Sequence, residues 1–365
     1  MIQFLAFAAG ALIAILTLSS AISTFVLPRG ARSQLNRLVF GLLRRLIEFL
    51  FRFVKVYSAR DAIMAYYAPV GLLLLVPTWY ALELIGYSLM FWGMGVRGFE
   101  EAVRLSGSSL LTLGFWAPER LGISMFAFSE AVIGLMLVGL LIAYLPTMYA
   151  AFARREQAVN LLNVRAGSPP SAVEMLRRYH RIHGLPELNA YWQVWETWFA
   201  DLEESHTTLP ALVFFRSPNA QNSWITAAGA VLDTASLSMS ALDIPYDARG
   251  ALCIRAGYIA LRRIADYFDF PHPRDPLYPQ NPISVGREEF DQALDGLAAQ
   301  GLPIKADRDQ AWQDFAGWRV NYDQVLLRLC SLVMPPVAPW SSDRMPRLKQ
   351  LPLIIRRKKR PAEDR

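Results

Sequence analysis

Three long runs of apolar residues, set apart by charged segments, limit what this chain can fold into. The runs cover residues 1–27, 66–92 and 121–149. Each is longer than the roughly 20 residues that an α-helix needs to cross the hydrocarbon core of a bilayer. Of the 365 residues, 53% are hydrophobic and only 19% are charged, which excludes a disordered chain and argues against an ordinary soluble enzyme. The sequence therefore predicts an all-α membrane protein with three spanning helices.

The positions of the positive charges predict how these helices are oriented. Eight arginines and lysines lie between residues 29 and 60, and Arg154 and Arg155 follow the third run. Because cytoplasmic loops of membrane proteins are rich in Lys and Arg, we expect both segments in the cytoplasm and the N-terminus outside. The first run has no basic segment before it and no clear cleavage site, so it is interpreted as a retained anchor. This pattern predicts a multi-pass protein of the plasma (inner) membrane.

Residues 35–57 have the periodicity of an amphipathic helix. The apolar side chains recur at steps of three and four: Leu35, Leu38, Leu42, Leu46, Phe49, Phe53 and Tyr57. The polar face is almost entirely basic, which favours a helix in the membrane interface over one packed on a soluble core. We expect this helix and the basic patch at residues 356–360 to contact anionic lipid headgroups. Although the pI is near 9.4, no nucleic-acid recognition motif is present, so no nucleic-acid partner is expected.

The segment between the second and third runs is unusual for an extracellular loop. Residues 99–111 have the pattern of a short amphipathic helix, and the apolar residues that follow include Thr112 and Gly114. Non-helical backbone at membrane depth is tolerated only where protein buries it or where it lines a water-filled path. The order of helix, Thr/Gly turn and long span predicts a re-entrant pore loop. The alternative is a membrane-dipping linker in a protein that is not a channel.

Two strings in this region resemble a known family. The residues 106–115 (SGSSLLTLGF) look like the pore-helix end and filter of bacterial two-span potassium channels, and residues 128–134 (FSEAVIG) are similar to the inner helix of those channels. The resemblance covers residues 66–155, about a quarter of the chain. It implies a homotetramer in which carbonyl oxygens of Thr112, Leu113 and Gly114 coordinate K⁺. It also implies passive cation movement, with no cofactor besides the permeant ion.

The filter departs from the family pattern Thr-Val-Gly-Tyr-Gly. Leu113 and Phe115 are mild changes, but Trp116 replaces the second glycine and Ala117 replaces the usual aspartate. A tryptophan in a backbone conformation that favours glycine would cost about 1–3 kcal/mol. We therefore expect Phe115 and Trp116 to pack behind or cap a shorter filter with weaker K⁺/Na⁺ selectivity. The alternative is a non-conducting receptor or scaffold that retains the channel fold.

Six other residues are weighed for roles around this loop. Gly134 and Pro146 lie where an inner helix hinges for gating, although glycine and proline also serve packing in membrane helices. Glu100 and Glu101 either give the outer mouth a negative field or stabilise a helix start. Glu130 is expected to fix the pore helix through a hydrogen bond to neighbouring backbone, while Glu83 has no assigned role.

The chain divides into five expected regions. These are an N-terminal transmembrane helix (1–28), a basic interfacial helix (29–62), a channel pore module (63–155), a cytoplasmic helical domain (156–334) and a basic tail (335–365). Within 156–334, periodicity and breaking residues predict helices at 171–183, 187–204, 220–239, 247–268, 287–299 and 307–333. Residues 209–215 fit a short strand, but no alternating pattern is sustained. We expect the domain to bias the gate under a regulator that the sequence does not identify.

Motifs of enzymes and metal sites are missing from the sequence. Cys253 and Cys330 are far apart and are interpreted as reduced, buried thiols. His206 lies near two glutamates, but the spacing is not that of a zinc site. No Gly-x-Ser-x-Gly motif, phosphate-binding loop or dinucleotide fingerprint occurs. We therefore do not expect an enzyme.

Overall fold

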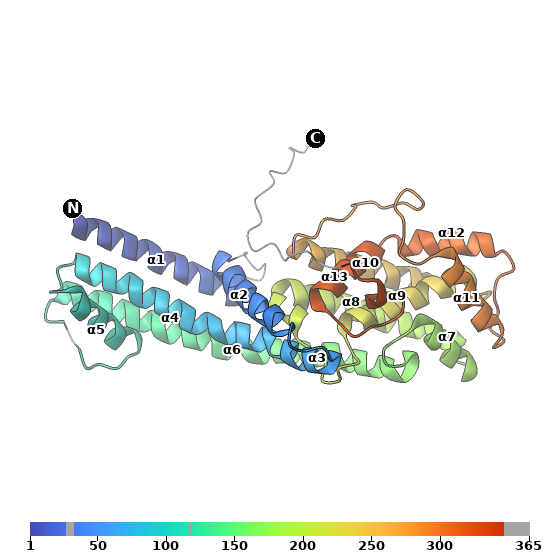
Figure 1. The fold of residues 1–365 in the computed structure, drawn as a ribbon, viewed down its shortest axis with the longest axis horizontal. Helices are drawn as coiled ribbons and strands as arrows, with labels where there is room; N and C mark the ends of the chain where they lie inside the picture. Colours follow the sequence, from blue (N-terminus) through green and yellow to red (C-terminus); the bar gives the residue numbers. More distant parts are fainter. Residues whose placement is uncertain (27–32, 117, 347–365) are drawn as a thin grey trace.

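The protein is elongated, with a bundle of long helices at one end and a helical domain at the other (Figure 1). The computed structural model describes residues 1–26, 33–116 and 118–346. Within these ranges the regular structure is helical, and an isolated β-bridge joins Leu242 to Ile304. The prediction of an all-α fold is therefore confirmed for the described part of the chain.

Three helices are long and apolar enough to cross a membrane, as predicted. They are α1 (Ile2–Phe25), α4 (Tyr67–Gly93) and α6 (Leu121–Ala166), which form the bundle (Figure 1). A shorter helix, α5 (Phe99–Leu110), packs on both α4 and α6 at the end of the bundle far from the helical domain. The membrane helices and the short helix thus follow the chain order expected from the sequence.

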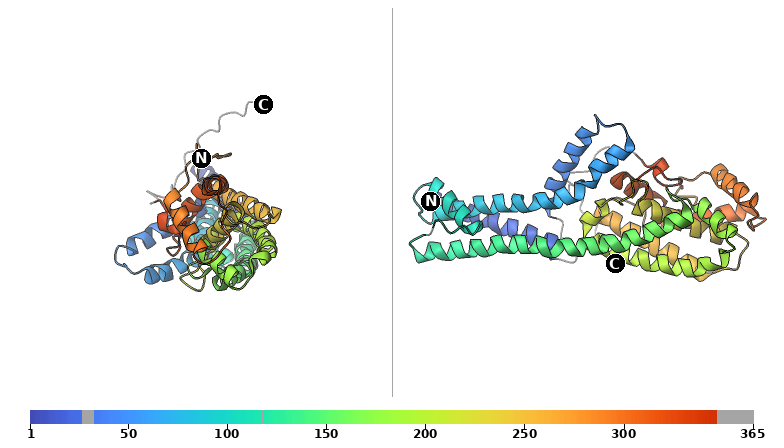
Figure 2. Two further views of the ribbon diagram at one scale, coloured as in Figure 1. Left: turned by 90° about the vertical axis from the view of Figure 1, so that its right-hand side faces the viewer. Right: turned by 90° about the horizontal axis from the view of Figure 1, so that it is seen from below.

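The helix α6 is continuous over 46 residues. At 1.5 Å per residue it is about 69 Å long, more than twice the roughly 30 Å of a bilayer core. Its first part lies in the bundle and its last part packs in the helical domain (Figure 2). The boundary expected between residues 155 and 156 therefore falls inside one helix, and Pro146 lies in that helix without ending it.

Small residues bring α1 close to α4. Ala6, Gly10 and Ala14 lie four residues apart on one face of α1 and are buried. A Cβ atom built on Gly10 would lie 2.3 Å from the carbonyl oxygen of Gly86. In a bilayer, such small-residue faces let two backbones approach and gain van der Waals contact. The first membrane helix is therefore a packed member of the bundle.

The helix expected over residues 35–57 ends at Leu50, and a second helix begins at Tyr57. α2 (Gln34–Leu50) and α3 (Tyr57–Ala65) project sideways from the junction of the bundle and the helical domain (Figure 2). Arg60 donates from Nε to Val54 O (2.7 Å) and from Nη2 to Phe51 O (3.2 Å). These bonds satisfy carbonyls that the break in the helix leaves without intrahelical partners. The boundary expected at 62/63 lies inside α3.

The two faces of α2 have different surroundings. Its apolar stripe is exposed along its whole length: Leu38, Leu42, Leu46 and Phe49, continued by Phe53. On the opposite face, Arg44 and Ile47 are buried. Arg44 donates to the carbonyl oxygen of Leu332 in the helical domain (3.3 Å) and pairs with Glu48. The helix is thus attached to the domain by one face, and none of the described residues covers its apolar stripe.

The helical domain is built around α9 (Trp224–Ala241), which is buried at every position except Met239. Four helices of the domain pack on it: α7 (Ala172–Arg181), α10 (Ala248–Tyr267), α12 (Arg308–Arg319) and α13 (Asp323–Val333). α8 (Leu188–Thr208) packs on α10, and α11 (Arg287–Ala298) packs on α7 and α12. Three 3-10 turns complete it: η1 (Leu185–Glu187), η2 (Pro210–Phe214) and η3 (Ser342–Arg344). The helix positions predicted for this domain are confirmed within a few residues, with two exceptions.

The first exception is residues 209–215, which contain the 3-10 turn η2 and no strand. The second is the helix expected over 307–333, which is divided into α12 and α13 by residues 320–322. The break turns Arg319 and Tyr322 toward the same carboxylate, that of Asp233 on α9. Both departures follow from tertiary contacts that hydrophobic periodicity does not report.

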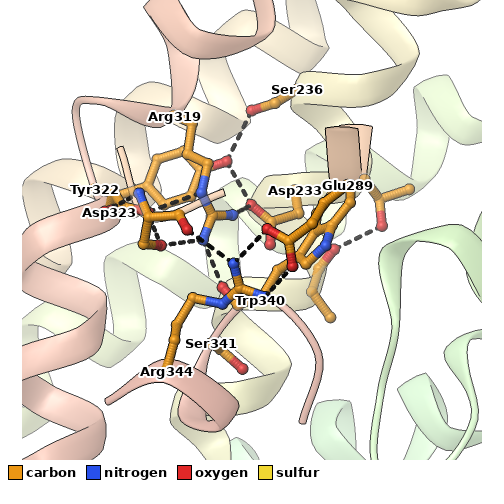
Figure 3. A network of polar contacts seen from close by, with 12 residues as sticks. Asp233, Ser236, Glu289, Arg319, Tyr322, Asp323, Trp340, Ser341 and Arg344 are labelled. Carbon is orange, nitrogen blue, oxygen red and sulfur yellow. Dashed lines mark hydrogen bonds and ion pairs between the residues drawn. The ribbon is translucent and has the colours of Figure 1, made fainter. Parts of the chain in front are cut away.

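A buried ion-pair network joins α9, α12, α13 and the C-terminal segment (Figure 3). The fully buried Arg319 pairs with Asp233, donates from Nε to Asp323 Oδ1 (2.8 Å) and donates from Nη2 to Trp340 O (2.5 Å). Tyr322 donates to the same Asp233 oxygen (2.8 Å). Burial lowers the pKa of Arg319, but the two aspartates outweigh this effect and hold the pKa above its usual value. The guanidinium therefore stays charged and holds four segments together.

The region expected to begin the C-terminal tail at residue 335 is instead packed as far as residue 346. Ser341 is buried, and Arg344 makes two bonds to Glu289 on α11, each of 3.0 Å. The hydrogen bonds from Arg344 lower the pKa of Glu289. The basic patch at residues 356–360 lies outside the described residues.

Replacing Arg319 with methionine should unfold the helical domain much more easily. The change leaves Asp233 and Asp323 buried without a counter-charge, which costs about 3–5 kcal/mol. The free energy of unfolding is measured on the full chain by tryptophan fluorescence during denaturant titration. The control is Arg308→Met, because Arg308 lies on the same helix and pairs with the exposed Asp295. Equal losses in both variants would contradict the role given to the network.

Candidate functional site

The candidate site is the segment from α5 to the start of α6. α5 begins after Gly98, whose φ of +81° favours glycine, and its first turn holds Glu100 and Glu101. Both acids are exposed, and Glu100 pairs with Arg104 at 2.6 Å. The buried face of α5 rests on α4 and α6 and consists of Ala102, Leu105, Ser106, Ser108 and Leu110.

Contacts with α4 and α6 show how far α5 reaches into the bundle. Ser106 Oγ lies 3.2 Å from the carbonyl oxygen of Leu84, nine residues before the end of α4. The carbonyl oxygen of Leu110 lies against Gly134, 13 residues beyond Leu121. At 1.5 Å per residue this is about 20 Å from the start of α6. The chain therefore enters the bundle as a helix and returns as a loop, of which residues 111–116 and 118–120 are described.

Ser108 holds the returning loop. Its carbonyl oxygen accepts from Leu113 N (2.8 Å), and its hydroxyl oxygen accepts from Trp116 N (3.0 Å). Thr112 and Gly114 both have positive φ, +54° and +72°. This conformation suits glycine, whereas it costs another residue about 1–2 kcal/mol. The loop is thus a defined turn in which the threonine is strained.

The apolar side chains of this loop are uncovered. Leu111, Leu113, Phe115 and Trp116 are exposed by 53%, 56%, 65% and 37%. In a bilayer, non-helical backbone must be buried in protein or line a water-filled cavity. The described residues of a single chain do not cover the side chains of residues 111–116. The site is therefore incomplete in one copy.

The adjoining face of α6 is uncovered as well. An exposed stripe follows steps of three and four residues from the start of the helix: Leu121, Met125, Phe128, Val132, Leu135, Val138 and Ile142. The opposite face of α6 packs on the rest of the bundle. Exposed apolar side chains thus occur both on the loop and on this stripe, and the exposed Glu119 and Arg120 lie between them in the chain.

The structure gives Gly134 a packing contact. A Cβ atom there would lie 2.2 Å from the carbonyl oxygen of Leu110, so only glycine admits the end of α5 this closely. Tyr80 on α4 donates to the carbonyl oxygen of Gly134 (2.5 Å). Pro146, the other residue considered for gating, is exposed 12 residues further along α6. Gly134 is therefore where α4, α5 and α6 meet.

Two glutamates are fully buried beside α5. Glu130 accepts a hydrogen bond from Ser106 Oγ, so its partner on the short helix is a side chain and not the backbone group expected. Glu83 on α4 has no hydrogen-bond donor for either carboxylate oxygen among the described residues. Next to them, the hydroxyls of Tyr87 and Ser129 share a hydrogen bond of 3.0 Å. The bundle thus encloses a polar cluster behind α5.

Sequence reasoning alone assigns no role to Tyr80 or Ser108. A signal was present for Ser108, because a polar side chain at membrane depth usually meets a backbone partner. No sequence signal pairs Tyr80 with Gly134, because they are 54 residues apart in the chain.

The possible metal ligands in the helical domain are not brought together. His206 is buried against Arg155 and Trp224, and Glu203 pairs with Arg263 on α10. Over residues 1–26, 33–116 and 118–346, no group of three His, Cys, Asp or Glu side chains could hold a metal ion. Burial raises the pKa of both Cys253 and Cys330, so neither thiol forms a thiolate readily.

Comparison of the chain with protein-family models, with curated proteins and with solved structures finds no match.

Replacing Gly134 with alanine should displace the end of α5. The new Cβ would overlap the Leu110 carbonyl, and overpacking of this kind costs about 1–3 kcal/mol. The apparent melting temperature of the full chain in detergent should fall. The control is Gly139→Ala, because Gly139 lies on the same helix with nothing within 4 Å of its Cβ position. Unchanged melting of Gly134→Ala would contradict the close contact.

Proposed function

We propose that this protein is a homotetrameric cation channel of the potassium type with a non-consensus filter. The observation that supports it is the loop 111–116. This loop begins next to Gly134, about 20 Å along α6, is not helical, and has exposed apolar side chains in one chain. Copies arranged around an axis would cover it, and one pore loop per chain supplies one quarter of a filter. The apolar stripe on α6 provides further surface for contacts between copies.

Ion movement in this channel is passive. Carbonyl oxygens of Thr112, Leu113 and Gly114 from four copies replace the hydration shell of K⁺. Phe115 and Trp116 pack behind these rings or cap them, which leaves fewer rings and weaker selection of K⁺ over Na⁺. The exposed Glu100 and Glu101 draw cations toward the mouth.

The helical domain regulates the pore through α6. In the domain, the buried Arg155 of α6 donates to the carbonyl oxygens of Leu212 (2.9 Å) and Phe215 (2.7 Å). Since α6 is one helix, a shift of the domain moves the part that lies beside the loop. A regulator acts by binding two such positions with different affinity.

The proposed orientation places the N-terminus outside and the helical domain in the cytoplasm. α2 then lies on the inner surface of the plasma (inner) membrane with its apolar stripe in the acyl region. Arg45, Arg52 and Lys55 are exposed beside that stripe, and the Arg52 guanidinium lies 5.7 Å from the Phe49 ring centre. This arrangement suits contact with anionic lipid headgroups.

A second candidate is a non-conducting receptor or scaffold that keeps the channel fold. Trp116 favours it, because the side chain stands where the family has its second filter glycine. Such a protein still forms the tetramer, and its helical domain is still connected to the loop through α6, but ions do not pass.

Ion flux from liposomes separates the two candidates. Vesicles that contain the purified protein are loaded with K⁺, Na⁺ or Cs⁺, and protein-free vesicles give the background. We expect K⁺ flux with a modest preference over Na⁺, and Trp116→Gly should raise that preference severalfold. Phe4→Gly, at an exposed aromatic residue of α1, should change nothing.

An absence of ion flux in the wild type alone does not exclude a channel, because the helical domain can hold the pore closed. If Trp116→Gly and a chain that ends at residue 346 are also silent at both signs of voltage, the channel proposal fails and the receptor remains.

A further inference from the structure

The polar cluster behind α5 contains buried carboxylate oxygens that lack hydrogen-bond donors among the described residues. Glu83 of α4 and Glu130 of α6 are both fully buried. Three of their four carboxylate oxygens have no donor among the described residues, and the fourth accepts from Ser106 of α5. Ser106 connects the two places, because its hydroxyl lies within hydrogen-bond distance of Glu130 and of the carbonyl oxygen of Leu84, the residue after Glu83. Buried polar groups without partners are rare, so this cluster requires an explanation.

The described helices around the cluster supply no positive charge. On α6, the segment from Leu121 to Phe152 has Glu130, Tyr144 and Tyr149 as its ionisable side chains, and Arg154 lies beyond it. α1 contains no ionisable side chain from Ile2 to Phe25. On α4, the Tyr80 hydroxyl is used by the Gly134 carbonyl and the Tyr87 hydroxyl by Ser129. On α5, the ionisable residues Glu100, Glu101 and Arg104 lie in the exposed outer part, and Arg104 pairs with Glu100.

Two ionised carboxylates without donors or a counter-ion are very unfavourable in such surroundings. A carboxylic acid differs in having a hydroxyl group that can donate. A bound proton therefore provides a hydrogen-bond donor and neutralises one negative charge, and the surrounding helices provide neither.

We propose that Glu83 and Glu130 form a proton-binding site inside the membrane bundle. The bound proton keeps the pair neutral and lets the Glu130–Ser106 contact hold α5 between α4 and α6. Loss of the proton makes Glu130 a stronger acceptor for Ser106, but it leaves negative charge beside α5 on carboxylate oxygens that have no donor among the described residues. The helices relieve this charge by moving apart, so the loop after Leu110 shifts. The site does not depend on conduction, because it rests only on the packing of α4, α5 and α6.

Labelling with dicyclohexylcarbodiimide tests the site. This apolar reagent adds to a protonated carboxyl group and rearranges to an N-acylurea, which increases the mass by that of the reagent. The full chain in liposomes is labelled at a series of pH values and analysed by intact and peptide mass. We expect an adduct on Glu83 or Glu130 that decreases at least tenfold as the pH rises and the pair loses its proton.

Matched variants show where the reagent reacts. The adduct should fall at least tenfold in the double variant Glu83→Gln, Glu130→Gln, in which neutral amides occupy the same space. It should persist in the control Glu100→Gln, Glu101→Gln, because those acids are exposed. An adduct that persists in the first double variant, or that does not respond to pH, overturns the proposal.

Infrared spectroscopy covers the case in which the reagent cannot enter the bundle. The difference between the wild-type and Glu83→Gln spectra near neutral pH should contain the C=O band of a protonated carboxylic acid. Glu130→Gln serves as the second variant if Glu83→Gln does not fold. A difference that contains only carboxylate bands, or bands that move when K⁺ replaces Na⁺, shows an ionised pair or a metal cation and contradicts a bound proton. Neither readout uses ion flux, so failure here differs from failure of the channel proposal.

Discussion

The contact between the Leu110 carbonyl and Gly134 sets the depth of the whole loop. Backbone groups in a bilayer must be satisfied, and helices do this within themselves. Residues 111–116 are not helical, so they depend on partners: Ser108 holds the loop from within, and α4 and α6 hold α5. What these contacts leave uncovered is an apolar loop and one face of α6. The need to cover that surface is the physical reason for proposing several copies around an axis.

The rigidity of α6 connects this loop to the rest of the protein. The same helix that meets Leu110 at Gly134 is bonded through Arg155 to the helical domain. Within the domain, Arg319 joins four segments, one of which is the chain beyond residue 335 (Figure 3). α2 joins the domain through Arg44 and presents its apolar stripe outward. The exposed stripe of α2, the helical domain and the loop are thus linked by buried arginines and one long helix.

Much of the fold could be predicted because helices that can span a membrane are recognisable in a sequence as long apolar runs. The three spans and α5 follow from such runs. The extension of α6 to Ala166 could not be predicted in this way, because Arg154 and Arg155 interrupt the apolar run that marks the span. The packing of residues 335–346 depends on a pairing of Arg319 with Trp340, which no local pattern reports. The same holds for the candidate site. The sequence pattern indicated the segment, but it could not indicate the partners of Gly134 and Glu130, because these partners lie on other helices.

The oligomeric state of the full chain in lipid nanodiscs tests the central claim most directly. Native mass spectrometry measures the mass without any assumption about ions or stimulus. The account predicts a particle that contains four copies of the 41.1 kDa chain, because one copy leaves residues 111–116 uncovered. A particle with one or two copies would contradict it, since neither could close a ring of pore loops.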